Sequence, residues 1–249
     1  NNQAIEFEEK PEKPRSNKAT MGIYIFNWDV LKDALERLKN QSGCDFGMHV
    51  IPYCHERGDK IMAYNYQGYW KDVGTLSAYW EANMELIDII PEFNLYEEFW
   101  RIYTKNTVLP PQYFSENAKV SGCIVGEGTE VYGEIYNSVI GSGVTVEEGA
   151  FITNSIIMNG TVIKAGARIE KAIIAENSVI GENTELGAFE EVPNKFKPNI
   201  YNGGLVTIGE GSVIPANVRI GKNVAIVGTT TVEDYPDGIL ASGESIIRQ

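Results

Sequence analysis

A 17-residue repeat constrains the fold of this 249-residue chain more than any other feature of its sequence. Residues 138–188 divide into three consecutive lines, SVIGSGVTVEEGAFITN, SIIMNGTVIKAGARIEK and AIIAENSVIGENTELGA. Aliphatic residues recur at matching places, six residues apart within each line. The matching sets are Ile140, Ile157 and Ile174, then Val146, Ile163 and Ile180, and then Ile152, Ile169 and Leu186. After an interruption at 189–204, the same step resumes at Ile208, Ile214, Ile220 and Ile226.

A 17-residue period built from three six-residue steps predicts a triangular parallel β-helix. Each face of a coil supplies one inward aliphatic side chain, which stacks on its counterparts in the neighbouring coils. Glycine and asparagine gather at the corners, because sharp turns need positive φ or little side-chain bulk. One coil cannot bury its own interior, so stability comes from stacking between coils. A sandwich of short strands would not keep a fixed register over three lines.

Glycine and tryptophan divide the chain near residue 112. Six of the 25 glycines lie in residues 1–112 and the other 19 follow, whereas all four tryptophans lie at or before position 100. Pro110 and Pro111 mark the change with a stiff turn. We therefore expect three parts, with an α/β domain over 1–92, a connector over 93–112 and the β-helix over 113–249.

The first part alternates predicted strands and helices, which is typical of a sheet covered by helices. β-Branched and aromatic residues between turn signals predict strands over 3–8, 22–26 and 60–66. Helical spacing and N-cap residues predict helices over 28–40, 46–55 and 76–90. About 90 residues are few for a nucleotide-binding sheet, and no glycine-rich βα loop is among them.

Charge and cysteine usage exclude several classes of protein. The formal net charge of −13 argues against a protein that binds nucleic-acid phosphates, since that needs a basic face. No apolar run approaches the ~18 residues of a membrane span. Cys44, Cys54 and Cys123 are scattered without a CxxC spacing, which indicates a reducing compartment and no structural zinc. We expect a cytoplasmic protein without nucleic-acid or membrane partners.

Several tempting motifs have simpler explanations. The tripeptide DFG at 45–47 matches a kinase metal motif, but no kinase catalytic loop accompanies it. Gly-x-Gly sequences recur in step with the coils and are predicted corners rather than phosphate loops. His49 and His55 precede the repeats and are predicted packing or surface residues. Hexapeptide acyltransferases use a histidine as general base. Residues 113–249 contain none, so the β-helix is predicted to be structural or regulatory.

Two short segments carry residues that packing does not explain. FEEKP at 7–11 ends a predicted strand with Glu9 and Lys10, and YWKDVGT at 69–75 places Asp72 just ahead of a predicted helix. The structural alternatives are an exposed charged strand end for the first segment and a helix cap for the second. On composition alone, the structural alternative is favoured for Glu9 and Lys10.

With these segments, the chain resembles the bacterial glucose-1-phosphate adenylyltransferases (ADP-glucose pyrophosphorylases) over nearly its whole length. YWKDVGT followed by the WEAN helix is more specific than EKP, which sugar nucleotidyltransferases share in general. The resemblance implies the C-terminal portion of such an enzyme, with part of its catalytic sheet followed by a left-handed β-helix of hexapeptide repeats. It rests on FEEKP, MGIYIFNWDVL (21–31), DFG..VIP (45–52), GYWKDVGTLSAYWEANMEL (68–86) and ILASGES (239–245).

The resemblance also implies a reaction and roles for four residues. The family joins ATP and glucose 1-phosphate into ADP-glucose and pyrophosphate, toward glycogen. Glu9 and Lys10 match the family's pair at the sugar-phosphate site, where Lys10 would hold the phosphate as a mobile point charge. Asp72 matches the metal-binding aspartate, which would hold Mg²⁺. Thr20 stands where the family usually has a substrate-contacting serine, so the hydroxyl is retained with an added methyl group.

These residue types suit the implied chemistry. The nucleophile is a phosphate oxygen, which is largely ionised at neutral pH because its second pKa is about 6. No general base is therefore needed. The site must supply positioning, charge neutralisation and in-line geometry at the α-phosphorus, which a lysine and a carboxylate-held Mg²⁺ provide.

The family's glycine-rich GGxGTRL-like loop, which cradles ATP phosphates, is not present in the 249 residues. We therefore expect the chain to be inactive alone. Two alternatives stay open, a non-catalytic regulatory subunit and another sugar-phosphate nucleotidyltransferase such as a mannose-1-phosphate guanylyltransferase. The resemblance further implies a homotetramer, possible pairing with a related regulatory subunit, and a sugar-phosphate allosteric effector. Lys195, Lys197 and Arg219 are candidates for effector binding, which surface solvation explains equally well.

Overall fold

The chain forms two compact units, Asn1–Trp70 and Lys71–Gln249. Their division falls before the predicted boundary near residue 112, because the helix that follows Lys71 packs on the repeat region. The predicted domain limits stay a prediction. The computed structural model describes residues 2–41, 43–104 and 108–248.

The first unit is built around three short helical segments. They are α1 (Trp28–Leu38), the π-helical turn η1 (Phe46–Val50) and α2 (Ile51–Glu56). Their core consists of the buried residues Ala34, Leu38, Val50 and Cys54. The first two predicted helices are therefore confirmed, with the second beginning as a π turn.

The predicted strands of this unit form only a minimal pairing. An antiparallel bridge joins Gln3 to Met62, and the amide of Ala4 donates to the carbonyl of Ile61 at 2.9 Å. Residues 22–26 form no ladder with any described segment. Their β-branched and aromatic residues favour an extended backbone, but a strand also needs a neighbour to satisfy its amides and carbonyls.

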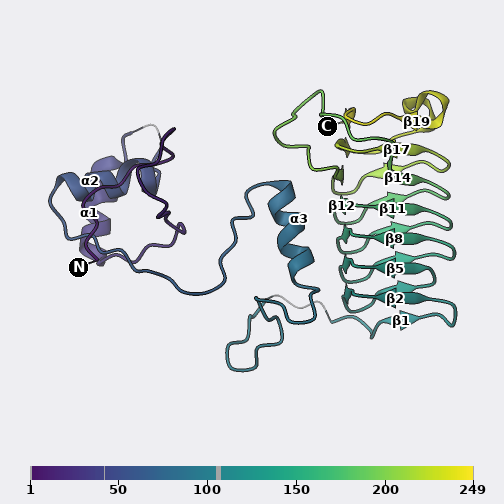
Figure 1. Cartoon of the computed structure of the whole chain (residues 1–249), viewed down its shortest axis with the longest axis horizontal. Coiled ribbons are helices and arrows are strands. Elements are labelled where there is room, and N and C mark those ends of the chain that lie inside the picture. The colour runs from purple at the N-terminus through teal and green to yellow at the C-terminus, as the bar shows by residue number, and fades with distance from the viewer. Residues whose placement is uncertain (1, 42, 105–107, 249) are drawn as a thin grey trace. The chain divides into compact units, whose positions relative to one another are not determined.

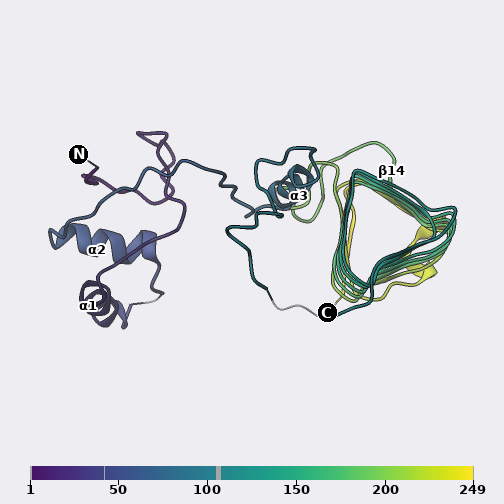
Figure 2. The ribbon, with the colours of Figure 1, turned by 90° about the horizontal axis from the view of Figure 1, so that it is seen from below.

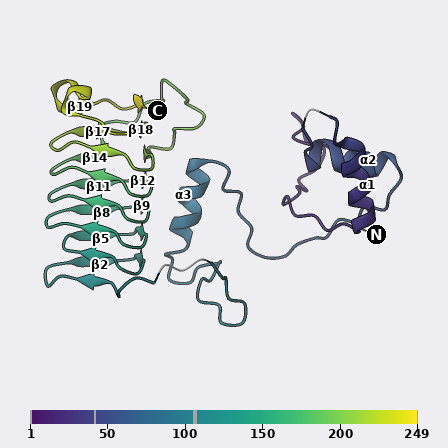
Figure 3. The same ribbon diagram turned by 180° about the vertical axis from the view of Figure 1, so that it is seen from behind.

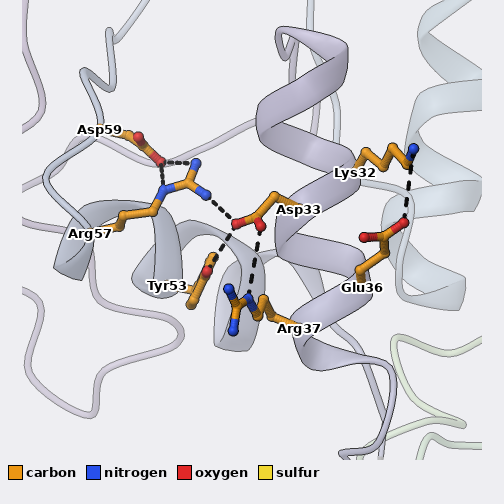
Figure 4. A network of polar contacts seen from close by, with 7 residues as sticks. All are labelled: Lys32, Asp33, Glu36, Arg37, Tyr53, Arg57 and Asp59. Atoms are coloured by element: carbon orange, nitrogen blue, oxygen red, sulfur yellow. Dashed lines mark hydrogen bonds and ion pairs between the residues drawn. The ribbon is translucent and has the colours of Figure 1, made fainter.

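A polar network joins α1 to the end of α2 (Figure 4). The Asp33 carboxylate accepts a hydrogen bond from the Tyr53 hydroxyl at 3.0 Å and pairs with Arg57. Arg57 also donates from Nε to Asp59 at 2.8 Å. These carboxylates raise the pKa of the Arg57 guanidinium, with the hydrogen bond to Asp59 as the main cause. The network holds α1 and the end of α2 together beside the small apolar core of the first unit.

The second unit contains a parallel β-solenoid with three flat faces (Figures 1 and 2). One sheet stacks β1 (Tyr113–Phe114), β4 (Glu130–Val131), β7 (Thr145–Val146), β10 (Val162–Ile163), β13 (Val179–Ile180) and β16 (Val213–Ile214). Another stacks β2 (Lys119–Ser121), β5 (Glu134–Tyr136), β8 (Phe151–Thr153), β11 (Arg168–Glu170), β14 (Glu185–Ala188), β17 (Arg219–Gly221) and β19 (Ile239–Leu240). The third stacks β3 (Ile124–Val125), β6 (Val139–Ile140), β9 (Ile156–Ile157), β12 (Ala172–Ile174), β15 (Val206–Ile208), β18 (Val224–Val227) and β20 (Ser245–Ile247).

The register of the strands follows the predicted period. Ile163 pairs with Val146 on one side and with Ile180 on the other, so equivalent side chains stack inside the coils. Across the interruption, Ile174 pairs with Ile208. The predicted inward aliphatics are at most 1% exposed, which confirms the β-solenoid and its core. Its handedness stays a prediction from the resemblance.

One corner of the solenoid is occupied by asparagine in several coils. Asn137, Asn154 and Asn223 have φ values of 44°, 50° and 54° there. Asparagine tolerates the left-handed region better than other residues with a Cβ atom. Lys171 takes the equivalent place with φ of 52°, although lysine has no such preference. This exception faces α3 (Leu76–Glu85), the helix that packs on the third sheet.

The interruption at 189–204 is pinned to the coils by Asn194, which is 2% exposed. Its Oδ1 accepts hydrogen bonds from the amides of Phe196 and Lys197 at 2.9 and 2.7 Å. Its Nδ2 donates to the carbonyl of Asn223 at 2.8 Å and to Ser245 Oγ at 3.0 Å. The excursion is therefore a structured loop with a buried polar anchor.

The last coils carry two short 3₁₀ turns, η2 (Val232–Asp234) and η3 (Pro236–Gly238). Between them, Tyr235 is 2% exposed and packs with the solenoid core. Its hydroxyl lies 2.8 Å from Thr230 Oγ1, which satisfies a buried polar group. No helix in the described parts of the chain has the length and apolar character needed to cross a membrane.

Candidate active site

Glu9 is held against the first turn of η1. Its side chain is 23% exposed and lies so close to Gly47 that a Cβ atom there would stand 2.2 Å from Glu9 Oε2. The neighbouring carboxylates have a different partner, since Glu6 and Glu8 pair with Arg15 at 2.5 and 3.4 Å. Glu9 is therefore placed by packing, which a freely solvated strand end would not require.

Lys10 occupies a strained backbone conformation at the surface. Its φ is 46°, in the left-handed region, and its side chain is 87% exposed. A residue that precedes proline favours extended backbone, so this conformation is unusual for Lys10 before Pro11. The Lys10 ammonium lies 3.9 Å from Glu9 Oε1. Strain of this kind gathers where function needs a side chain aimed in one direction.

Thr20 is joined to the same helical turn through aromatic rings. Thr20 Oγ1 donates to the Tyr24 hydroxyl at 3.2 Å and accepts from the amide of Gly22 at 3.1 Å. The Tyr24 ring stacks on Phe46, with centroids 5.8 Å apart and an interplanar angle of 8°. Glu9 and Thr20 thus reach consecutive residues, Gly47 and Phe46.

The contribution of Phe46 and Gly47 is what reasoning from sequence missed. DFG at 45–47 is not a kinase motif here. Asp45 caps the turn by accepting from the amide of Met48 at 2.7 Å, Phe46 supports Tyr24, and Gly47 leaves room for Glu9. The available signal was the place of these residues in the DFG..VIP segment. The predicted structural role of His49 is confirmed, since its Nδ1 accepts from the amide of Asp45 at 3.0 Å.

Asp72 lies in the second unit, at the start of the segment that leads into α3. Asp72 is exposed, and its Oδ1 accepts from the amide of Gly74 at 2.8 Å. Thr75 is the N-cap of α3, since its hydroxyl accepts a hydrogen bond from the amide of Ala78 at 3.2 Å. The helix ends earlier than predicted, at Glu85, and residues 87–90 are turns and bends before Pro91. Lys10 and Asp72 belong to different units.

A pocket of about 350 Å³ adjoins the Asp72 segment. One side is formed by the first residues of α3 and the turn before it, and the other by the 189–204 loop of the solenoid. Its lining residues are Val73, Gly74, Thr75, Leu76, Tyr79, Asn199 and Ile200.

The residues around Asp72 fit one kind of metal site. No group of three or more His, Cys, Asp or Glu side chains within the described ranges could enclose a metal ion. Mg²⁺, however, is usually bound by one or two carboxylates together with substrate phosphates and water. An exposed carboxylate with one oxygen oriented by Gly74 suits a divalent ion shared with a phosphate substrate.

The three basic residues considered for an effector have protein partners. Lys195 pairs with Glu244, and Arg219 Nε donates to Glu185 at 2.7 Å. The Lys197 ammonium lies 5.0 Å from the centroid of the Phe196 ring. Each of the three cations has a different protein partner, so these contacts do not form a shared binding site for one effector. The effector site stays unassigned.

Comparison with known proteins matches both parts of the chain. Residues 1–89 match the model of the nucleotidyl transferase family, and residues 110–208 match that of the GlmU-like, C-terminal hexapeptide family. The glucose-1-phosphate adenylyltransferase of Lachnospira eligens is 66% identical over 247 residues, which are 99% of this chain and 58% of that protein. Those of Acetivibrio thermocellus and Thermotoga maritima are 45% and 49% identical, over 100% and 98% of this chain and 59% and 58% of their own lengths. The chain thus spans a little under three fifths of these relatives. Over the length that it spans, it is similar to the glucose-1-phosphate adenylyltransferases.

Proposed function

We propose that this chain carries the sugar-phosphate side of an adenylyltransferase that makes ADP-glucose and pyrophosphate from ATP and glucose 1-phosphate. The observation that carries the proposal is the Glu9–Lys10 turn, where packing against Gly47 fixes Glu9 and a left-handed backbone presents Lys10 to solvent. A structural strand end would need neither feature. The names of the similar proteins supply the reaction.

In the proposed reaction, a phosphate oxygen of glucose 1-phosphate attacks the α-phosphorus of ATP. A new oxygen–phosphorus bond forms, the bond from the α-phosphorus to the bridging oxygen breaks, and pyrophosphate leaves with the electron pair. Lys10 neutralises the attacking phosphate and holds it in line, while Glu9 limits where the ammonium can lie. Thr20 offers its hydroxyl to the substrate, with Tyr24 fixing its direction.

Asp72 is the proposed ligand for Mg²⁺. When bound, Mg²⁺ would neutralise charge on the substrate phosphates. The contribution of the chain is to keep the Asp72 carboxylate oriented, through Gly74 and the capped start of α3.

The 249 residues contain no glycine-rich GGxGTRL-like loop, so we expect no ADP-glucose synthesis from them alone. The resemblance also supports a cytoplasmic homotetramer controlled by a sugar-phosphate effector. Light scattering of the enzyme would test the tetramer, and a single monomeric species would contradict it.

The test is an assay of this chain joined to the rest of its reading frame. Pyrophosphate release is measured with each nucleoside triphosphate against glucose 1-phosphate and mannose 1-phosphate. The expected result is a preference for ATP with glucose 1-phosphate. Lys10→Gln should raise the KM for the sugar phosphate at least tenfold, whereas Lys13→Gln, at an exposed lysine of the same loop, should not. A preference for GTP with mannose 1-phosphate, or no turnover, would favour one of the alternative functions.

A further inference from the structure

α3 buries one side on the outward surface of the third solenoid sheet (Figures 1 and 3). The contact is a small apolar cluster beside β9 and β12, separate from the core inside the coils. From the helix it contains Leu76, Tyr79, Trp80 and Met84, and from the solenoid Ile156, Met158, Ile173 and Leu205. Apolar packing of this kind sets how close the helix lies, but it is non-directional and does not fix its rotation.

Two hydrogen bonds supply that direction. Trp80 Nε1 donates to the carbonyl of Asn154 at 2.7 Å, and Ser77 Oγ donates to Asn202 Oδ1 at 2.9 Å. Asn154 belongs to the asparagine corner of the coils and Asn202 to the 189–204 loop. The helix is therefore tied to the solenoid at two separate places.

Lys171 adds a third tie at a cost to local backbone preference. The Lys171 ammonium lies 5.1 Å from the centroid of the Trp80 ring, within the range of a cation–π interaction. The equivalent residues in the two preceding coils, Asn137 and Asn154, are better suited to the shared left-handed conformation. Lys171 departs from the asparagine of the two preceding coils at the place where the Trp80 ring stands beside it, so the contact with Trp80 offsets a less favourable backbone conformation.

The segment that contains Asp72 is also attached to α3. Lys71 Nζ pairs with Glu85 at 2.5 Å and with Glu81 at 3.4 Å, so the residue next to Asp72 is clamped to the last turns of α3. Asp72 itself is oriented by Gly74. The path from Asn154 through Trp80 and α3 to Asp72 consists of packed or hydrogen-bonded neighbours within one unit.

We propose that Trp80 is a positioning residue, which fixes the Asp72 carboxylate relative to the solenoid through its bond to Asn154 and its contact with Lys171. Its catalytic importance rests on the proposed function of Asp72, whereas its effect on the segment does not. Because a displacement of about 1 Å can lower a rate about a hundredfold, small rotations of α3 are sufficient to matter.

The first experiment measures the segment itself. Hydrogen exchange is followed at the amides of Gly74 and Ala78, which donate to the side chains of Asp72 and Thr75. The protein used is this chain joined to the rest of its reading frame. Trp80→Phe keeps an aromatic ring, though a smaller one, and removes the donor, so exchange should be roughly threefold to tenfold faster, the change expected from one lost hydrogen bond. Lys171→Asn restores the residue type of the corner, so the coil should fold normally while the same amides exchange faster.

The matched control is Arg168→Gln. Arg168 lies 4.9 Å from the centroid of the Phe151 ring, a contact of the same kind on a different solenoid sheet. This variant should leave exchange at Gly74 and Ala78 unchanged. Unchanged exchange in Trp80→Phe and Lys171→Asn would overturn the proposal, as would an equal acceleration in Arg168→Gln.

The second experiment measures the consequence. The concentration of Mg²⁺ that gives half-maximal ADP-glucose synthesis should rise about threefold or more in Trp80→Phe, and less in Lys171→Asn. Arg168→Gln should match the parent. A parent enzyme that makes no ADP-glucose would overturn the proposed function, while the exchange results would still decide whether Trp80 positions the segment. Faster exchange with an unchanged Mg²⁺ requirement would overturn the link to Asp72.

Discussion

The carboxylate of Glu9 lies where the side chain of residue 47 would begin if that residue were not glycine. Gly47 is buried, and its φ is not in the left-handed region, so it is needed for space rather than for backbone freedom. The atom it would meet is the end of a side chain that can move. A side chain at residue 47 can therefore change the position of Glu9 with little effect on the stability of the fold.

Gly47→Ala should therefore change function more than stability. The methyl group displaces the Glu9 carboxylate, so the KM for the sugar phosphate should rise roughly tenfold. The free energy of unfolding should change by no more than about 1 kcal/mol. Steady-state kinetics of the longer enzyme and urea unfolding measure the two effects. Adding Glu9→Asp withdraws the carboxylate from the methyl group, so partial recovery of KM is expected and its absence would count against steric displacement.

Lys10 offers a test of backbone strain. Lys10→Gly and Lys10→Ala both remove the ammonium and should lose sugar-phosphate affinity equally. Only glycine relieves the left-handed conformation, so the glycine variant should be about 1 kcal/mol more stable than the alanine variant. Urea unfolding of the two proteins measures the difference. Equal stabilities would mean that the conformation of Lys10 carries no strain.

Asn194 should be a large contributor to the stability of the solenoid. Asn194→Ala leaves the amides of Phe196 and Lys197 in the 189–204 loop, and the buried carbonyl of Asn223 on the coils, without their partner, which costs about 2–3 kcal/mol. Lys195→Ala is the matched control, since it removes only an ion pair at the surface and should cost less than about 1 kcal/mol. Denaturant unfolding distinguishes them. Similar losses in both variants would show that the loop is not anchored through Asn194.

The Glu147–Lys164 pair predicts a pH dependence. The hydrogen bond from Lys164, at 2.8 Å, lowers the pKa of the Glu147 carboxyl below its ordinary value. The folded state then favours the charged carboxylate. This stabilisation is complete above the pKa that the Glu147 carboxyl has in the unfolded chain, about 4.3. It is lost as pH falls through the lower pKa that the same carboxyl has in the folded protein.

Glu147→Gln should accordingly flatten the fall of Tm with acidification below about pH 5. Calorimetry over a pH series measures this slope. Glu148→Gln, at the exposed neighbouring residue, serves as the control and should leave the slope as in the parent. An unchanged slope in Glu147→Gln would contradict the prediction.

The three cysteines should react with thiol reagents at different rates. Cys44 is exposed, whereas burial raises the pKa of the Cys54 and Cys123 thiols, and Asp59 adds to the effect at Cys54. Because the thiolate is the reactive form, one thiol per chain should react rapidly near pH 8 and two more only in denaturant. Mass spectrometry of the labelled peptides identifies them. Rapid labelling of Cys54 would show that the helical core of the first unit opens readily.

The solenoid was predictable because its information is local and repeated. Ile140, Ile157 and Ile174 restate the same inward position coil after coil, so the sequence pattern and the packing coincide. The pattern in residues 22–26 is not repeated elsewhere in this way. Whether such a segment forms a strand depends on a neighbouring strand, which its own residues do not specify.

Contacts of the candidate site were harder to anticipate for the same physical reason. Trp80 and Asn154 are 74 residues apart and meet through a side chain and a backbone carbonyl, which leave no periodic trace. The closeness of Glu9 and Gly47 likewise depends on tertiary packing. Residue types and the motif predict which side chains form the site, and this stays a prediction, while the contacts that hold those side chains required the structure.

Ile174 pairs directly with Ile208, so the stacking of the coils continues across the 189–204 loop. A new loop can therefore be admitted at a corner without any change in the residues that stack beneath it. Loops at the corners are free to diverge in length and chemistry, while the interior column keeps its pattern. Such a fold gives related enzymes a common scaffold whose corners can acquire different contacts one at a time.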